Sequence, residues 1–299
     1  MLNHDSQPAC NLLSSERLKT DVVGGSTLSM EERMIELRVL HTIPELEAAV
    51  DLELSVWGLN PRHAVPSALM HVLALRGGLV MGAYVDERMV GMLLSLPAQD
   101  GDEWILWSHM TGVHPEYQGR GIGLALKRQQ REWALAHGYR TIGWTVDPLQ
   151  RGNAHFNFHL LAHDAALSAC TYHVDFYGAM DDDINRGIPS DRIEALWRID
   201  QPCLHTPLPV ETYPLLSADA ELRPVPTTDL ISWAAPAYTV ALPRSLDAVR
   251  SAASTAGVLA WRLAVREALQ AALAQGYVIV NFLSSPDLNA YLLQRTGDV

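Results

Sequence analysis

The sequence predicts a mixed α/β fold whose front half is largely antiparallel. Three observations support this prediction. Between residues 35 and 199, segments with the alternating pattern of strands outnumber helical segments. Two of them, 79–85 and 89–96, are joined by a short charged turn and predict a hairpin. An amphipathic helix that ends at Gly138 leads into a further strand at 141–146, so the sheet is expected to be mixed.

The expected elements follow the order β-α-α-β-β-β-α-β-α-β-β. Residues 35–40 alternate as a strand does, and Thr42 is a suitable N-cap for the helix predicted over 43–56. The remaining helices are expected at 67–75, from the glycine-rich turn to about 137, and from about 153, and the remaining strands at 104–113, 173–177 and 192–199.

Composition divides the chain into four parts. Residues 1–33 are rich in Ser, Asn, Thr and Gly without periodicity, which predicts a disordered extension. Residues 34–200 hold the elements above. Clustered prolines mark 201–216 as a linker, and 217–299 form a smaller C-terminal α/β extension. In this extension we expect an amphipathic helix at 260–275 and strands at 222–225, 238–242, 277–282 and 289–293.

The two halves share a similar junction of helix, glycine and strand. Residues 135–139 read LAHGY and residues 273–277 read LAQGY, and Arg128 and Arg266 precede them at the same offset. A degenerate internal repeat would explain the match. Such junctions are common in α/β proteins, however, and we favour this simpler explanation.

Charge and cysteine content exclude several classes of protein. Among 299 residues, 22 Lys and Arg face 34 Asp and Glu, a net charge of −12, whereas a nucleic-acid partner requires a basic surface. Cys10, Cys170 and Cys203 lack the spacing of a zinc site or a disulfide scaffold, which fits a reducing compartment. No apolar run approaches the roughly 18 residues that span a bilayer. We therefore expect a cytoplasmic protein without a nucleic-acid or membrane partner.

The clearest chemical signal is the stretch 113–123, which reads Val-His-Pro-Glu-Tyr-Gln-Gly-Arg-Gly-Ile-Gly. It joins a predicted strand to a predicted helix, and its three glycines allow a tight turn and close approach of a ligand. Unpaired N–H groups and the helix dipole make such a helix start a site for anions. A pyrophosphate is the natural ligand.

Two familiar phosphate-binding patterns do not fit this stretch. A Walker A loop requires Gly-Lys-Ser/Thr, and the dinucleotide pattern GxGxxG has a different glycine spacing. The pattern [Q/R]-x-x-G-x-[G/A] does fit, as Gln118-x-x-Gly121-x-Gly123. In its context of strand, turn, amphipathic helix, glycine and strand, the stretch resembles the acyl-CoA loop of the GNAT acetyltransferase superfamily. The resemblance covers roughly Ile35 to Tyr177.

The resemblance implies the GNAT fold, a mostly antiparallel mixed sheet flanked by helices. It also implies transfer of an acyl group from acetyl-CoA or another acyl-CoA to an amine by direct attack, without a metal. The backbone of Val113 would pair with the pantetheine arm, a backbone N–H near Met110 would polarise the thioester carbonyl, and Asn153 would hydrogen-bond to the cofactor. The pyrophosphate would be held by the loop residues Gln118, Gly119, Arg120, Gly121, Ile122, Gly123 and Leu124.

Further segments resemble one uncharacterised bacterial branch of the superfamily. The branch is similar to acyltransferases found near N-acylamino-acid racemases, which implies succinyl-CoA and an amino acid as substrates. The chain departs from the branch at residues 161–166, and this puts the local geometry of the acceptor wall in doubt. The segments that carry the resemblance are 144–150, 153–154, 174–178, 189–192 and 261–267.

The reaction needs a base that deprotonates the attacking amine. His109, on the strand beside the thioester, titrates in the most suitable range, although a hydrogen-bonded sheet histidine is the structural alternative. Asp147 ends a strand beside the cofactor and could instead cap the following turn. Glu103 and His155 are further candidates. His155 and His159 share a helix face but lack a third ligand for a metal.

The reaction also needs an acid that protonates the departing thiolate. Many GNAT enzymes use a tyrosine about seven residues after the asparagine, but residue 160 is Leu. Tyr177 and Tyr172 are the candidates to replace it. Arg192 could clamp a carboxylate of the acceptor or of a succinyl group, or could form a surface salt bridge instead.

These features predict a CoA-dependent N-acyltransferase that acylates the amine of a small molecule such as an amino acid. The C-terminal extension is expected to shape the acceptor site or a homodimer interface. The alternative is a non-catalytic acyl-CoA-binding protein on the same scaffold, which the missing tyrosine favours.

Overall fold

The fold is known from a computed structural model in which one sheet runs through the whole molecule. The structure describes residues 18–20, 35–58, 60–180, 187–203, 211–228, 231–285 and 288–295. No helix in these ranges is long and apolar enough to cross a membrane.

The front of the molecule is an antiparallel sheet. Its first helix begins where the sequence predicts, because the Glu45 carboxylate accepts the Thr42 N–H at 3.0 Å in a capping box. Asp86 and Glu87 both have positive φ, as the two-residue hairpin turn requires. The elements are β1 (Leu18–Thr20), β2 (Ile35–Val39), α1 (Ile43–Trp57), η1 (Pro61–His63), α2 (Ser67–Leu75), β3 (Leu79–Val85), β4 (Arg88–Asp100) and β5 (Glu103–Val113).

The centre of the molecule adds one long helix and three strands. Helix α3 packs Ile122 and Leu126 against the face of β3 that carries Met81, whereas α1 and α2 cover the opposite face at Val80. The elements are η2 (Pro115–Tyr117), α3 (Ile122–Ala136), β6 (Thr141–Val146), α4 (Arg151–His155), the π-helical turn η3 (Phe156–Leu160), η4 (Leu161–His163), β7 (Ala166–His173) and β8 (Arg192–Arg198).

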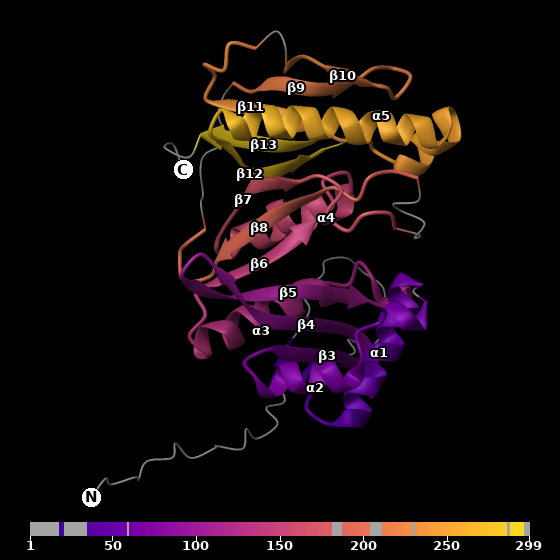
Figure 1. Cartoon of the computed structure of the whole chain (residues 1–299), viewed down its shortest axis with the longest axis vertical. Coiled ribbons are helices and arrows are strands. Elements are labelled where there is room, and N and C mark those ends of the chain that lie inside the picture. Colours follow the sequence, from indigo (N-terminus) through magenta and orange to yellow (C-terminus); the bar gives the residue numbers. More distant parts are fainter. Residues whose placement is uncertain are drawn as a thin grey trace, which may run out of the picture.

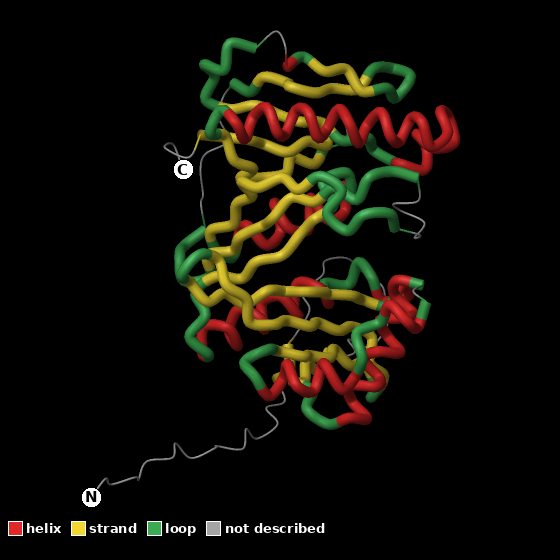
Figure 2. The backbone as a smooth tube through the Cα atoms, viewed as in Figure 1, coloured by secondary structure: helices red, strands yellow, loops and turns green. Residues whose placement is uncertain are grey.

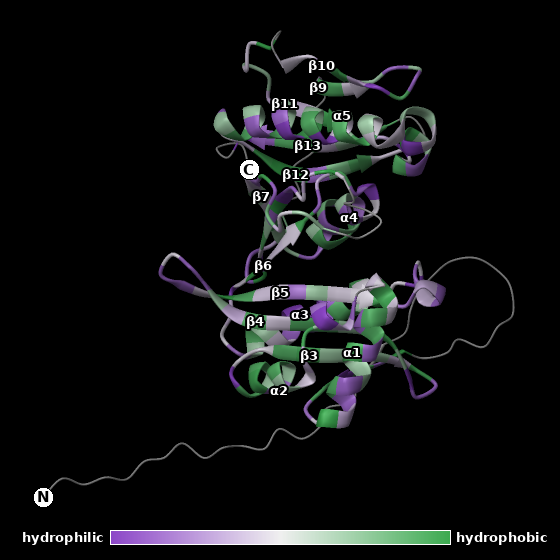
Figure 3. Ribbon diagram, turned by 45° about the vertical axis from the view of Figure 1, so that its right-hand side comes forward, coloured by the Kyte–Doolittle hydropathy of each residue, from purple (hydrophilic) through white to green (hydrophobic). Residues whose placement is uncertain are grey.

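The C-terminal part continues the sheet under one long helix. Helix α5 (Leu246–Ala274) starts earlier than the predicted helix and covers one face of the last strands (Figure 2). It is kinked at Ala253 and Ser254, which have non-helical backbone angles. Hydrophobic residues run along β12 and β13 (Figure 3). The strands are β9 (Tyr213–Ala218), β10 (Pro224–Pro226), β11 (Ala237–Ala241), β12 (Tyr277–Ser284) and β13 (Asn289–Arg295).

Within the described residues, the sheet has 13 strands in the order β1-β2-β3-β4-β5-β6-β8-β7-β12-β13-β11-β9-β10 (Figure 1). This mixed, mostly antiparallel sheet with flanking helices confirms the predicted fold class. The C-terminal part joins the central part along β7, where Ile279 pairs with Ala169. One core includes Trp197 of β8, Trp261 of α5 and Tyr291 of β13, so the extension is not packed separately. The expected homodimer stays a prediction.

Three expectations about the elements need correction. The strand expected at 173–177 is β7, which ends at His173, and residues 174–177 form a turn. The segment Ala-Leu-Ser-Ala-Cys has weak strand propensity, and it forms a strand because it pairs with β8. Strand β9 begins inside the expected linker 201–216, of which residues 204–210 lie outside the described residues. In the expected extension 1–33, Leu18–Thr20 pair with β2, and the rest lies outside the described residues.

Candidate active site

Strands β5 and β6 open away from each other at the centre of the sheet. Their parallel pairing consists of Leu106 with Ile142 and Trp107 with Gly143, and beyond these pairs the two strands diverge (Figure 1). A side chain at residue 143 would come within 3.1 Å of the Trp107 ring, which explains the glycine. On its other edge, β5 stays paired with β4 as far as Val113. The opening therefore exposes one backbone edge of β5 to a ligand.

His109 lies at a β-bulge next to this opening. Leu94 of β4 pairs with Met110 and Ser95 pairs with Ser108, so His109 has no partner residue on β4. The His109 side chain makes no hydrogen bond within the described part of the chain. Desolvation lowers its pKa, which favours the neutral form. A neutral imidazole at this position suits a base.

The loop between β5 and α3 leaves a row of backbone N–H groups unpaired. Gly119 and Gly121 have φ of 74° and 78°, a left-handed conformation that glycine adopts without strain. The first bond of the helix runs from the Ala125 N–H to the Gly121 carbonyl at 3.0 Å. No described residue accepts a hydrogen bond from the six N–H groups of residues 119–124. Such a row at a helix N-terminus fits an anion.

The side chains expected to contact the cofactor have different surroundings. Gln118 donates its side-chain amide to the Val113 carbonyl at 3.0 Å, so it holds the loop on β5. The Arg120 guanidinium donates to the Glu116 carbonyl at 2.9 Å. Asn153, on α4, is exposed, and its side chain makes no hydrogen bond within the described ranges. Asn153 therefore remains available to a ligand.

A buried lysine, which the sequence analysis did not single out, contacts both β5 and β6 where these strands begin to separate. The Lys127 ammonium donates to the Ser108 hydroxyl at 2.9 Å and to the Gln130 amide oxygen at 3.1 Å. It also lies 3.9 Å from the centroid of the Trp144 ring on β6. Only 3% of the residue is exposed. The sequence held one sign of this burial. Lys127 lies on the buried face of the amphipathic helix α3, to which Ile122 also belongs.

Tyr177 reaches the opening from the loop between β7 and β8. Its hydroxyl lies 3.3 Å from the Thr145 hydroxyl on β6, and half of the residue is exposed. The Arg192 guanidinium stacks over the Tyr177 ring at 5.1 Å. Arg192 is buried rather than engaged in a surface salt bridge. The structure thus brings Tyr177, Thr145 and Arg192 together.

Asp147 has a structural partner, and its role as a base stays a prediction. Arg262 of α5 donates to both carboxylate oxygens of Asp147, at 2.7 and 3.0 Å. The Leu149 N–H donates to one of them at 2.9 Å. Arg192 lies 3.9 Å away. Both carboxylate oxygens are thus engaged by a permanent cation, and Asp147 links β6 to α5.

Tyr172 is unsuited to the role of acid. Its hydroxyl donates to the Asp191 carboxylate at 2.6 Å, and burial together with this anion raises its pKa. Asp191 also accepts two hydrogen bonds from Arg266 of α5, both at 2.8 Å. Desolvation would raise the pKa of Asp191, but its hydrogen bonds outweigh this effect and lower it. Asp191 is therefore a second buried link to α5.

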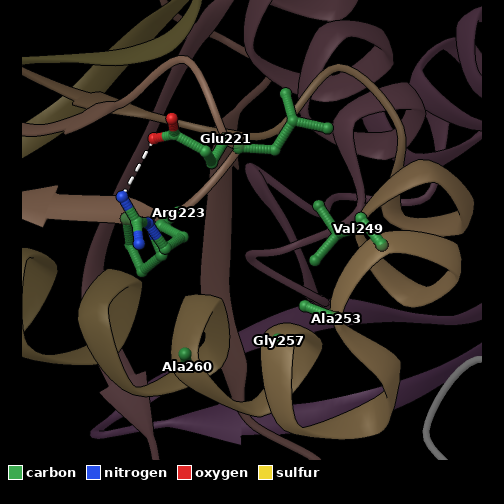
Figure 4. Close-up of a pocket in the computed structure, with 9 residues that line it drawn as sticks. Glu221, Arg223, Val249, Ala253, Gly257 and Ala260 are labelled. Carbon is green, nitrogen blue, oxygen red and sulfur yellow. Dashed lines mark hydrogen bonds and ion pairs between the residues drawn. The ribbon is translucent and has the colours of Figure 1, made fainter.

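The remaining candidates lie elsewhere. Glu103 is bound by Arg198 at 3.0 Å and by Thr141, away from the loop. His155 stacks on His159 with centroids 4.8 Å apart. No group of three metal-ligating side chains that could hold a metal ion is found in the described ranges. A separate apolar pocket lies between the β9–β10 turn and α5, with Leu222, Val249 and Ala253 in its lining (Figure 4).

Comparison with known protein families finds a match over part of the chain. Residues 46–157 match the model of the acetyltransferase (GNAT) family, so the chain contains a GNAT acetyltransferase domain. The matched region includes the opening, the bulge and the loop. Acetyl-CoA is the co-substrate of this family. No curated protein matches the chain.

Several solved structures resemble a little more than half of the chain. The ribosomal-protein-S18-alanine N-acetyltransferase of Escherichia coli is 16% identical, with a TM-score of 0.45 over 58% of this chain and 99% of that chain. Naa50 of Arabidopsis thaliana, in complex with a bisubstrate analogue, is 13% identical, with a TM-score of 0.43 over 54% and 97% of the two chains. At these scores the likenesses say nothing about the substrate of this chain.

Proposed function

We propose that this protein is an acyl-CoA-dependent N-acyltransferase whose acceptor is a small amine that carries a carboxylate, such as an amino acid. The observation that carries the proposal is the row of unpaired N–H groups of residues 119–124, directly beside the open edge of β5. A pyrophosphate fits this row, and an extended pantetheine arm fits the exposed strand edge. When bound, acyl-CoA would supply an acyl group activated as a thioester.

The chain's own residues would then bind, orient and deprotonate the acceptor. His109, neutral because desolvation lowers its pKa, would accept a proton from the attacking amine. The backbone of β5 beyond the bulge would offer N–H groups to the acyl oxygen. The exposed side chain of Asn153 would donate to the bound cofactor. Tyr177, from the loop between β7 and β8, would contact the acceptor, since its hydroxyl lies beside Thr145 of β6.

The carboxylate of the acceptor is inferred from the charges around Arg192. Three guanidinium groups, those of Arg192, Arg262 and Arg266, contact the two carboxylates of Asp147 and Asp191. The balance of 3 − 2 leaves one positive charge, and Arg262 and Arg266 already hold the carboxylates with two hydrogen bonds each. Arg192 is therefore the guanidinium that would bind a carboxylate, either of the acceptor or of a succinyl group.

Thermal unfolding with CoA, acetyl-CoA and succinyl-CoA tests the cofactor site. A ligand at about 100 times its Kd adds about 2.7 kcal/mol to the free energy of unfolding, which raises Tm by several degrees. We expect this rise for the wild type and not for Gly119→Asp, whose carboxylate would occupy the anion site. Gly138→Asp is the matched control, because Gly138 also has positive φ and open space but lies at the other end of α3. No rise with any CoA species would overturn the proposal.

A non-catalytic acyl-CoA-binding protein is the second candidate. It is favoured by Leu160, which stands where a tyrosine acid is expected and is partly exposed on the π-helical turn. Both candidates bind CoA, so turnover separates them. Release of thiol from acetyl-CoA or succinyl-CoA, measured with a panel of amino acids and simple amines, is expected for the enzyme. Cofactor binding without thiol release from any pair would favour the binding protein.

A further inference from the structure

The structure holds a buried cation that the proposed function leaves unused. Lys127 projects from α3 to the point where β5 and β6 separate. Its ammonium contacts Ser108, the first β5 residue beyond the last pair with β6, and the ring of Trp144 on β6. It therefore lies at the base of the opening into which a pantetheine arm would extend.

The groups that face Lys127 are all uncharged. They are Ser108 from β5, Gln130 from α3, Trp144 from β6 and, behind Gln130, Ser95 from β4, which accepts from the Gln130 amide at 2.7 Å. No described carboxylate forms an ion pair with Lys127. A buried ammonium without a counter-ion is costly, because its desolvation is not compensated. An anion that arises in the opening would supply the missing charge.

The Ser108 hydroxyl connects this cation to the opening. Its oxygen accepts the Lys127 hydrogen bond, and its own hydrogen has no acceptor among the described residues. Ser108 directly precedes His109, the residue at the bulge, in β5. Ser108 is as enclosed as Lys127, with 4% of the residue exposed, so a ligand reaches its hydroxyl only by entering the opening between β5 and β6.

We propose that Ser108 and Lys127 form a proton relay that protonates the CoA thiolate as it departs, in place of the tyrosine that Leu160 replaces. The proposal rests on the proposed function. As the thioester C–S bond breaks, the Ser108 O–H gives its proton to the sulfur, and the Lys127 ammonium gives one of its protons to the Ser108 oxygen. The products are a thiol, an intact Ser108 hydroxyl and a neutral Lys127 amine, which regains a proton from water through Ser108 after product release.

The proton affinity of Lys127 suits this role. Burial lowers its pKa from 10.5 to about 7. At neutral pH both protonation states are then populated, so the amine can release a proton and regain it. An ordinary surface lysine would hold its proton far too tightly.

The experiment is a pH titration of reduced CoA bound to the protein, followed by the ultraviolet absorbance of the thiolate. S-methyl-CoA has no ionisable thiol, so its complex gives the background from tyrosines. We expect the thiol in the wild-type complex to titrate at least one pKa unit below a free thiol, which titrates at about 8.5. In Lys127→Met and Ser108→Ala the thiol pKa should rise towards the free value. Lys127→Arg keeps the charge but holds its proton permanently, so it should keep the thiol pKa low and still slow the release of thiol from acyl-CoA. Wild-type thiol release in Lys127→Arg would show that the charge alone acts and that the relay is wrong.

The outcomes separate the two proposals. If CoA binds but the wild-type thiol titrates at or above the free value, the relay is wrong and the proposed function stands. The relay is equally wrong if Lys127→Met leaves the thiol pKa unchanged. If reduced CoA does not bind to the wild type, both proposals fail. Should Lys127→Met not fold, the wild-type titration and Ser108→Ala decide the question.

Discussion

The molecule buries two cations in opposite ways. Arg262, on α5, has no exposed surface, and its guanidinium makes hydrogen bonds of 2.7 and 3.0 Å to the carboxylate of Asp147. Lys127, on α3, is nearly as deeply buried, but its partners are a hydroxyl, an amide and an aromatic ring. The first arrangement is typical of a structural link between two parts of a fold. The second is typical of a functional site, where a charge is kept without a counter-ion.

The pKa values of the two groups respond accordingly. For Arg262, desolvation opposes the charged form, but the hydrogen bonds and attraction of Asp147 outweigh it and raise its pKa. For Lys127, desolvation acts without an opposing anion and lowers its pKa to about 7. A guanidinium stays charged in either setting, so the two groups differ in side-chain type as well as in partner. The direction of each pKa shift follows the presence or absence of a carboxylate.

The largest expected effect is a loss of stability when the ion pair between Arg262 of α5 and Asp147 is broken. Arg262→Met leaves the buried Asp147 carboxylate without its main partner, and Arg192 at 3.9 Å replaces it only in part. We expect a loss of about 3 kcal/mol in the free energy of unfolding, measured by urea denaturation. The control is the double variant Arg262→Met with Asp147→Leu, which removes both charges and should regain most of the loss. A loss below about 1 kcal/mol in the single variant would contradict the structural role.

The second expected effect is a pH dependence that only the unpaired cation produces. Because the pKa of Lys127 is lower in the folded state, the unfolded chain binds more protons between pH 7 and about 10. The free energy of unfolding of the wild type should therefore rise with pH above 7, by up to about 1.4 kcal/mol per pH unit. In Lys127→Met this contribution disappears.

Urea denaturation at a series of pH values from 6 to about 9 measures this difference. Below pH 7 both states of the wild type hold the proton, so Lys127→Met should be the more stable protein there, by a constant amount. The advantage should shrink as the pH rises. Parallel curves for the two proteins over the whole range would show that Lys127 titrates normally and is not enclosed as described.

The sequence predicted most of the fold and the glycine-rich turn at the start of α3, for identifiable reasons. Some features depend only on a few adjacent residues, and these can be predicted from the sequence. They are the hairpin turn at Asp86 and Glu87, the capping box of Thr42 and the glycine-rich loop. Strand β7 was misplaced because its Ala- and Ser-rich segment forms a strand only through pairing with β8.

The side-chain roles were harder to predict, because they depend on partners far away in the sequence. Asp147 was predicted as a base, and nothing in the sequence indicated that Arg262, 115 residues later, holds both of its oxygens. Lys127 was not singled out from the sequence, because its importance comes from Ser108 on one strand and Trp144 on another. Periodicity identifies a buried position, but it does not say which group will face it.

The smallest expected effect is a difference between Arg128 and Arg266. These two arginines occupy equivalent positions before the two similar junctions of helix, glycine and strand. Arg128 forms two hydrogen bonds with Asp164, at 2.8 and 3.0 Å, but it is mostly exposed. Arg266 forms an equally close pair with Asp191, whose side chain is fully buried. Solvent and salt screen the first pair, so Arg128→Ala should cost less than about 1 kcal/mol in urea denaturation and less still at high salt. Arg266→Ala removes a partner of a buried carboxylate and should cost more than Arg128→Ala at either salt concentration. Equal losses in the two variants would mean that the environment of the carboxylate does not set the strength of these pairs, and the contrast between paired and unpaired buried charges would lose its physical basis.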